Sequence, residues 1–177
     1  SSITKNNIKL ILSLLSKLSN PKILIVGGGS IGNGLEKLYE EYSENITSFD
    51  IYMSKNISFI ADGHSIPVSD NSYDFVLVQA VLEHVVDPQL VVSEIYRVLK
   101  NNSIVYSETP FLQHVHEGAY DFHRFTESGH RYLFKNFKLI KSGYTKGVGT
   151  SLIWSLAYFF QGLFNSKKIN KLTRLFF

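Results

Sequence analysis

The sequence predicts an α/β fold in which parallel strands form one sheet with helices on both faces. Three observations lead to this prediction. Apolar runs of strand length alternate along the chain with helical apolar patterns, which is typical of βαβ units. The run 22–26 is almost wholly apolar, as expected of a parallel strand covered on both faces, and it leads into Gly27–Gly29. Polar and acidic residues follow the other runs, at the carboxyl ends where ligands bind in such sheets.

The first elements are placed by apolar spacing and by chain breakers. A helix is expected over 4–18 and ends before Pro21, since a residue that precedes proline disfavours the helical conformation. A second helix is expected from Ser30 to about Tyr42, with its free N–H groups pointing to the space above the glycines. A strand over 46–51 follows it and contains Asp50 near its end.

The remaining elements continue the alternation. Strands are expected at 57–61, 73–79, 103–107 and 137–144, and helices at 88–99 and 126–134. The helix at 88–99 places Leu90 on its inward face, and residues 100–102 form the turn after it.

Composition sets the broad class. The chain has 177 residues, of which 44% are hydrophobic, enough to bury the core of one domain. The formal net charge is only +3, which does not indicate nucleic-acid binding. The lack of cysteine excludes disulfides, thiolate metal ligands and cysteine nucleophiles. We expect a single domain with an N-terminal helix (1–20), a core (22–144) and an apolar C-terminal segment (150–177).

The glycine-rich turn indicates a nucleotide or nucleoside site. Glycines permit a tight turn after a strand and close approach of a ligand to the backbone, because no Cβ is in the way. Gly27, Gly29 and Gly32 also fit the dinucleotide spacing Gly-x-Gly-x-x-Gly. An NAD(P)-binding Rossmann enzyme is therefore an alternative.

Two acidic residues fall at the strand ends that such a site would use. Asp50 comes 18 residues after Gly32, and its carboxylate can accept hydrogen bonds from two adjacent ribose hydroxyls. Asp62 can accept a hydrogen bond from the exocyclic amine of adenine. The alternatives are that Asp50 caps a turn and that Asp62 with Gly63 forms an Asp-Gly turn.

A longer set of motifs carries a family resemblance. Four segments resemble those of class I S-adenosylmethionine-dependent methyltransferases: Gly27–Ser30, Ser48–Asp50, Ala61–Pro88 and Glu94–Lys100. The third of them contains Leu-Glu-His-Val-Val-Asp-Pro. The likeness covers about residues 22–143, and it is greatest to the small-molecule, type 11-like branch. It implies a Rossmann-like parallel-sheet sandwich without its last strand or strands.

The resemblance also implies a cofactor and the residues that hold it. The cofactor would be S-adenosylmethionine, with S-adenosylhomocysteine as product, bound by the core 22–144. Its methionine part would lie at the glycine turn and near Gln79, its ribose at Asp50, and its adenine beside Ile51, Asp62 and Gly63. The full set of expected cofactor residues is Gly27, Gly28, Gly29, Asp50, Ile51, Asp62, Gly63 and Gln79.

The chain departs from the family pattern at Ile25. The family has an acidic residue two positions before the first glycine, and that residue recognises the amino group of the cofactor. Ile25 occupies this position. An inactive methyltransferase-like interaction module that has lost cofactor binding is therefore a second alternative.

Histidines are the candidate catalytic residues, since an oxygen or nitrogen acceptor needs a base near neutral pH. The candidates are His84, His114, His116 and His123. The resemblance places His84 beside the methyl group or the acceptor. No metal site is assigned, although the alternating His114 and His116 could share one with Asp121.

The segment around His123 bears on the acceptor. Asp121-x-x-Arg124-Phe-Thr126 resembles a segment of methyltransferases that are encoded with glycan-building enzymes. We therefore expect a small-molecule methyl acceptor, a saccharide or related metabolite. A purely structural alternative is a scaffold in which Arg124 pairs with Asp121 or Glu117.

The side chains of the apolar run at 151–164 have to be buried against another surface. The run packs on its own domain or on a second subunit of a homodimer, or it lies on a membrane surface with residues 165–177 as a basic flank. No signal peptide is evident, so the expected location is cytoplasmic, with membrane association through 151–177 as the variant.

Overall fold

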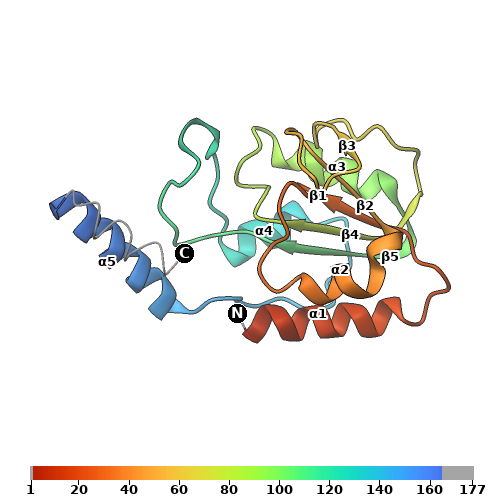
Figure 1. Cartoon of the computed structure of the whole chain (residues 1–177), viewed down its shortest axis with the longest axis horizontal. Coiled ribbons are helices and arrows are strands. Elements are labelled where there is room, and N and C mark those ends of the chain that lie inside the picture. Colours follow the sequence, from red (N-terminus) through yellow and green to blue (C-terminus); the bar gives the residue numbers. More distant parts are fainter. Residues whose placement is uncertain (1, 165–177) are drawn as a thin grey trace.

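The computed structural model describes residues 2–164 of the chain (Figure 1). In chain order its elements are α1 (Ser2–Leu15), β1 (Ile23–Val26), α2 (Glu36–Tyr42), the 3-10 turn η1 (Ser43–Asn45), β2 (Ile46–Asp50), β3 (Phe59–Ile60), β4 (Tyr73–Gln79), α3 (Pro88–Val98), β5 (Leu99–Glu108), η2 (Gly118–Tyr120), α4 (Glu127–Leu133) and α5 (Val148–Phe164).

The five strands form one parallel sheet in the order β3-β2-β1-β4-β5. The two central strands, β1 and β4, are the most apolar, because both of their faces are covered. Their pairing aligns Val26 with Val78, so the two strands end side by side. The predicted parallel α/β sheet is confirmed.

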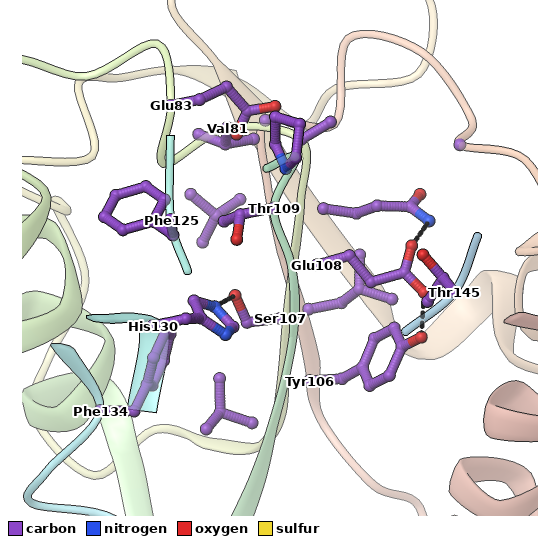
Figure 2. Close-up of a pocket in the computed structure, with 18 of the residues that line it drawn as sticks. Val81, Glu83, Tyr106, Ser107, Glu108, Thr109, Phe125, His130, Phe134 and Thr145 are labelled. Atoms are coloured by element: carbon purple, nitrogen blue, oxygen red, sulfur yellow. Dashed lines mark hydrogen bonds between the residues drawn. The ribbon is translucent and has the colours of Figure 1, made fainter. Parts of the chain in front are cut away.

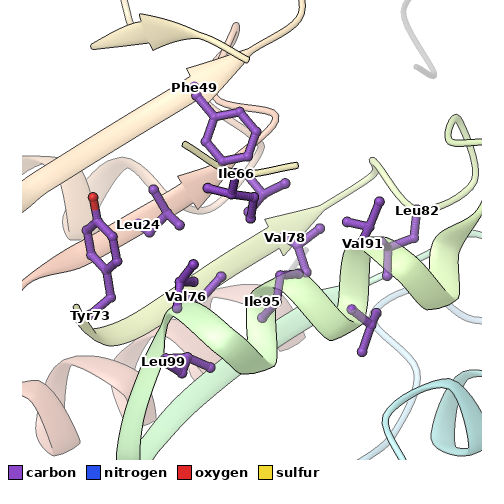
Figure 3. Close-up of a cluster of buried hydrophobic side chains, with 13 residues drawn as sticks. Leu24, Phe49, Ile66, Tyr73, Val76, Val78, Leu82, Val91, Ile95 and Leu99 are labelled. Carbon is purple, nitrogen blue, oxygen red and sulfur yellow. The ribbon is translucent and has the colours of Figure 1, made fainter. Parts of the chain in front are cut away.

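Alternate residues of the central strands supply two separate cores. Leu24, Val76 and Val78 pack with α3 on one face (Figure 3). Ile25 and Leu77 pack with α1 and α2 on the other face. Figure 1 shows the same layering, with α1 and α2 together on one side of the sheet and α3 on the opposite side.

Side-chain caps fix the starts of the two helices that flank the site. The Asp87 carboxylate accepts a hydrogen bond from Leu90 N at 3.0 Å, and Pro88 takes the first position of α3. Thr126 caps α4 by accepting from Gly129 N at 3.1 Å. Leu90 itself is 45% exposed, so its predicted inward orientation is wrong. The buried stripe of α3 runs through Val91, Val92, Ile95 and Val98.

The helix predicted from Ser30 begins only at Glu36. Gly34 has φ +90°, a left-handed conformation that interrupts a helix, and Gly32 and Asn33 before it also have low helix propensity. The expectation that a helix N-terminus lies directly above Gly27–Gly29 is therefore wrong. An extended turn lies there instead.

Two strand predictions also need correction. Residues 137–144 do not join the sheet, and Leu139 and Ile140 are 50% and 67% exposed. Leu139 and Ile140 are therefore surface residues, whereas Phe137 packs against the core, and no strand of residues 2–164 pairs with this segment. The strand predicted at 57–61 shortens to Phe59–Ile60.

The predicted turn at 100–102 lies inside β5. Leu99 pairs with Tyr73, whereas Ile104 pairs with Phe75, so residues 100–103 bulge out of the ladder. Asn102 has φ +62° within this bulge.

Helix α5 stands apart from the sheet in Figure 1. Trp154 and Ala157 are buried, but most of the other large apolar residues of α5 are exposed. Within residues 2–164, no helix is long and apolar enough to cross a membrane. The expected basic flank at 165–177 lies outside the described residues.

Candidate active site

A cleft follows the carboxyl ends of the strands and continues around β5. Its walls come from the glycine turn, from the ends of β2, β4 and β5, and from the segment 109–127. Figure 2 shows how β5 divides it: Tyr106 and Glu108 lie on one side of the strand, and Ser107, Phe125 and His130 lie on the other. This division follows from the alternation of side chains along a strand.

The glycine turn is packed too tightly for side chains. Gly27 has φ +73°, and a Cβ there would lie 2.2 Å from Val81 Cγ2. Gly28 N donates to the Phe49 carbonyl at 2.8 Å. A Cβ on Gly29 would lie 2.7 Å from Asp50 Oδ2. The turn therefore places bare backbone on the cleft wall, next to the end of β2.

Asp50 is the carboxylate at that strand end. Its Oδ2 accepts from Gly29 N at 2.9 Å, which fixes the side chain beside the turn. Within the described chain, no ion pair involves Asp50, so its remaining acceptor capacity is not taken up by a cation. Ile51 and Tyr52 follow it and are 52% and 63% exposed. A bare glycine turn, a carboxylate and an adjacent apolar shelf fit a phosphate-free nucleoside with a ribose and a flat base.

Asp62 lines the cleft but is engaged in its own turn. Its Oδ1 accepts from His64 N at 2.9 Å and lies 2.6 Å from His64 Nδ1. The backbone hydrogen bond from His64 lowers the pKa of the Asp62 carboxyl, and the His64 side chain adds to this effect. The Asp-Gly turn that the sequence left open is therefore present. Gly63 lies against Val91, where a Cβ would sit 3.3 Å from Val91 Cγ1.

Gln79 joins a polar network on the side of β5 that faces α1. Gln79 Nε2 donates to Glu108 Oε2 at 2.7 Å, and the Tyr106 hydroxyl donates to the other oxygen of Glu108. Asn7 of α1 donates to the Tyr106 hydroxyl at 3.2 Å. Burial, followed by the nearby Glu108 carboxylate, raises the pKa of Tyr106. A Cβ on Gly32 would lie 1.8 Å from Gln79 Oε1, so this network touches the extended turn after the glycines.

The network includes residues that the sequence did not single out as site residues. Tyr106 and Glu108 stand two positions apart in a strand, so they share a face and can contact one ligand. That period-2 spacing was the available signal. Nothing in the sequence indicated that Asn7 would hydrogen-bond to Tyr106, because this contact depends on how α1 packs on the sheet.

Glu83 is a buried carboxyl without a hydrogen-bond partner. The residue is 1% exposed, and neither side-chain oxygen has a hydrogen-bond partner among the described residues. Burial raises the pKa of Glu83 to about 7, although Arg124 acts in the opposite direction. Its backbone carbonyl accepts from Phe122 N and His123 N, which ties the segment after β4 to the 109–125 loop.

His84 and His116 meet beside Glu83. His84 Nδ1 lies 2.7 Å from the Tyr120 carbonyl, which requires a proton on Nδ1 and leaves Nε2 with the lone pair in the neutral ring. His84 Nε2 lies 3.7 Å from Glu83 Oε1. The rings of His84 and His116 meet edge to face with centroids 4.9 Å apart.

A buried ion pair holds the His116 side of the cluster. Asp121 Oδ2 lies 3.3 Å from His116 Nδ1 and accepts from His116 N at 2.9 Å. Arg124 donates to both oxygens of Asp121 and to the carbonyls of Gln113, His114 and His123. The Arg124 guanidinium is the main reason that the pKa of Asp121 is lowered. The scaffold with Arg124 on Asp121 is thus present.

The other two candidate histidines lie away from the cleft wall. The His114 ring packs on Tyr158 of α5, with centroids 4.7 Å apart. His123 Nε2 lies 3.3 Å from the Val86 carbonyl. Among the described residues, the structure therefore brings together His84, His116 and Glu83, which was not one of the candidate catalytic residues, whereas the His114 ring packs on Tyr158 instead.

Comparison with known proteins gives a consistent picture. Residues 24–107 match the family model described as a methyltransferase domain. No curated protein matches the chain significantly.

Two solved structures illustrate the similarity of fold, and a third match covers less of both chains. The PH0226 protein from Pyrococcus horikoshii is 18% identical with a TM-score of 0.55, over 84% of this chain and 88% of that one. An S-adenosylmethionine-dependent methyltransferase from Methanosarcina mazei is 20% identical with a TM-score of 0.52, over 70% and 82% of the two chains. A Galdieria sulphuraria protein described as a sarcosine dimethylglycine methyltransferase is 23% identical with a TM-score of 0.47, over 59% of this chain. The present chain spans 45% of its length.

Proposed function

We propose a methyl acceptor and a division of roles for this chain, which carries a class I S-adenosylmethionine-dependent methyltransferase domain. The acceptor is a small molecule, of the class of saccharides or related metabolites. The observation that carries the proposal is that the glycine turn with Asp50 and the Glu83–His84–His116 cluster line one continuous cleft.

The cofactor residues act mainly by position. Asp50 holds the ribose hydroxyls, and Ile51 and Tyr52 form the shelf for the adenine. Gly27–Gly29 leave room for the methionine part. When bound, S-adenosylmethionine supplies a methyl group on a cationic sulfonium. Alignment of the attacking atom with that group accounts for much of the rate in such reactions.

Two polar groups lie near the expected methionine part. Gln79 was expected there, and the structure adds Glu108, which accepts its hydrogen bond at 2.7 Å. Ile25 is buried in the core on the α1 face of the sheet. We propose that the Glu108 carboxylate provides the negative charge for the amino group of the cofactor that Ile25 does not provide.

The acceptor lies against His84 and His116. Both rings face the cleft, and Tyr120 and Phe125 border the same region. Aromatic walls with a few polar groups are typical of small-molecule sites. The saccharide class is favoured by the likeness of Asp121–Thr126 to segments of methyltransferases encoded with glycan-building enzymes.

A product assay tests the function. Purified chain with S-adenosylmethionine is screened against sugars, nucleotide sugars and small amine and carboxylate metabolites, and formation of S-adenosylhomocysteine is measured. Acceptor-dependent product with a sugar, reduced at least tenfold in His84→Ala, supports the proposal. Turnover only with an acceptor of another class overturns the saccharide assignment. Cofactor binding without turnover on any of these acceptors contradicts the proposed acceptor class, and absence of both cofactor binding and turnover favours the interaction module.

A further inference from the structure

We propose that Glu83, His84 and His116 bind one divalent transition-metal ion, and that Zn²⁺ is the ion that suits them best. One ligand atom from each residue can be chosen so that all three atoms lie within 4.8 Å of one another. Two imidazole nitrogens and a carboxylate oxygen are donors that zinc accepts. His84 follows Glu83 directly, whereas His116 comes from the loop after β5.

The three ligand atoms need to move only slightly closer together to bind one ion. Zinc bonds to nitrogen and oxygen are about 2.0–2.2 Å long, so two ligand atoms on a tetrahedral ion lie about 3.4 Å apart. His84 Nε2 and Glu83 Oε1 are already 3.7 Å apart. The ligand atom of His116 lies within 4.8 Å of the other two, so it reaches the same spacing by moving about 1.4 Å or less.

Glu83 is the strongest indication of a cation. Its carboxyl group is buried in the segment between β4 and α3 and has no hydrogen-bond partner among residues 2–164. A buried carboxyl in this condition is costly, and buried charges are usually paired or bound to a metal. A cation between Glu83 and the two histidines would supply the missing partner.

The histidines are held as metal ligands usually are. A ligating imidazole commonly donates its other N–H to a carbonyl or a carboxylate, which fixes both tautomer and ring orientation. His84 has the Tyr120 carbonyl at 2.7 Å from Nδ1. His116 has Asp121 Oδ2 at 3.3 Å from Nδ1, and Asp121 is itself fixed by Arg124. Each ring therefore keeps Nε2 for the ion.

The position of the cluster suggests what the ion does. Three protein ligands leave a coordination position open, as in catalytic zinc sites. All three residues line the cleft. A hydroxyl that binds such an ion has a lowered pKa. This role rests on the proposed function, because it takes the methyl acceptor as the molecule in the open position, whereas metal binding itself does not depend on that function.

Calorimetry on metal-free protein tests the site. The full chain, without an affinity tag and after chelator treatment, is titrated with Zn²⁺. We expect one ion per chain and a Kd raised roughly 100-fold or more in Glu83→Gln and His116→Ala, since loss of an outer-shell partner alone costs about 10–100-fold. Asp121→Asn should fall within that 10–100-fold range. His123→Gln, which changes a histidine of the same loop outside the cluster, should bind like wild type.

An absorption spectrum of the Co²⁺-bound protein distinguishes loss of a metal ligand from loss of folding. Co²⁺ bound to the wild-type chain should show visible absorption of a nitrogen- and oxygen-ligated ion, altered in Glu83→Gln protein whose circular dichroism matches wild type. Absence of Zn²⁺ binding, or equal affinity in wild type, Glu83→Gln and His116→Ala, overturns the proposal. S-adenosylmethionine titrated in parallel separates the claims, because metal binding without cofactor binding contradicts only the proposed function, and the converse contradicts only the metal site.

Discussion

The two ends of the cleft are built differently. At the cofactor end, functional groups follow directly after short strands, and the backbone holds them, as when Gly29 N fixes Asp50 at 2.9 Å. At the histidine end, a long loop brings His116 to Glu83 and His84, and a buried ion pair between Asp121 and Arg124 holds that loop. The first end is fixed by the sheet, whereas the second depends on a few side chains. Substitutions should therefore affect the two ends separately.

The largest effect is expected from Arg124→Met. This change leaves Asp121, whose side chain is 1% exposed, as an unpaired buried charge. Breaking a buried pair in this way costs about 3–5 kcal/mol of unfolding free energy. Urea unfolding measures it, with Arg131→Met on α4 as the control. A loss below about 1 kcal/mol would mean that the loop does not depend on this pair.

The next effect concerns the cofactor end alone. Asp50→Ala removes two charge-assisted hydrogen bonds and should weaken S-adenosylmethionine binding by about 2–4 kcal/mol, at about 1.5–3 kcal/mol each before solvent compensation. Calorimetric titration gives the affinity, and the Zn²⁺ affinity of the same variant should stay at the wild-type value. Unchanged cofactor affinity would show that Asp50 serves only the turn.

A smaller effect is expected at Gly27→Ala. The added methyl group would meet Val81 Cγ2 at 2.2 Å in a left-handed conformation. Overpacking of this kind costs about 1–3 kcal/mol of stability. Gly147→Ala, where no atom lies within 4 Å of the added Cβ, is the matched control. Equal melting temperatures of the two variants would contradict the tight packing of the glycine turn on Val81.

The smallest expected effect is on the pH dependence of stability, and it comes from His130 beside β5. Burial lowers the pKa of His130, whose Nε2 lies 2.9 Å from Ser107 Oγ. Its folded pKa is below the unfolded value of about 6.5, so the unfolded state binds the proton first. Stability should therefore be complete above about pH 6.5 and should fall as the pH drops below it. Unfolding at several pH values should show a weaker acid dependence in His130→Gln, and an identical slope would place His130 in solvent.

The same contrast explains what the sequence could predict. The strand at 73–79 and the acid at the end of β2 are marked by local apolar runs and by residues adjacent to them. The start of α2 at Glu36 was missed because the left-handed Gly34 outweighs the apolar spacing. The prediction of a strand at 137–144 was wrong because the apolar content of a segment does not show whether a strand is available to pair with it.

The histidine cluster lay beyond local reasoning. Of the four candidate histidines, only His84 was singled out by the resemblance, and the path of the 109–125 loop is what brings His116 beside it. Glu83 was visible in the Leu-Glu-His motif, but its burial depends on the loop that closes over it. Contacts between residues more than 30 positions apart leave no periodic signal.

Every role proposed for the cleft depends on S-adenosylmethionine binding at its glycine end. The most direct measurement is calorimetric titration of the purified chain with S-adenosylmethionine, S-adenosylhomocysteine and NAD in parallel. We expect saturable binding of the two sulfur compounds and no binding of NAD. Binding of NAD alone would contradict it and would favour the nicotinamide enzyme, and binding of none of the three would contradict it in favour of an inactive module.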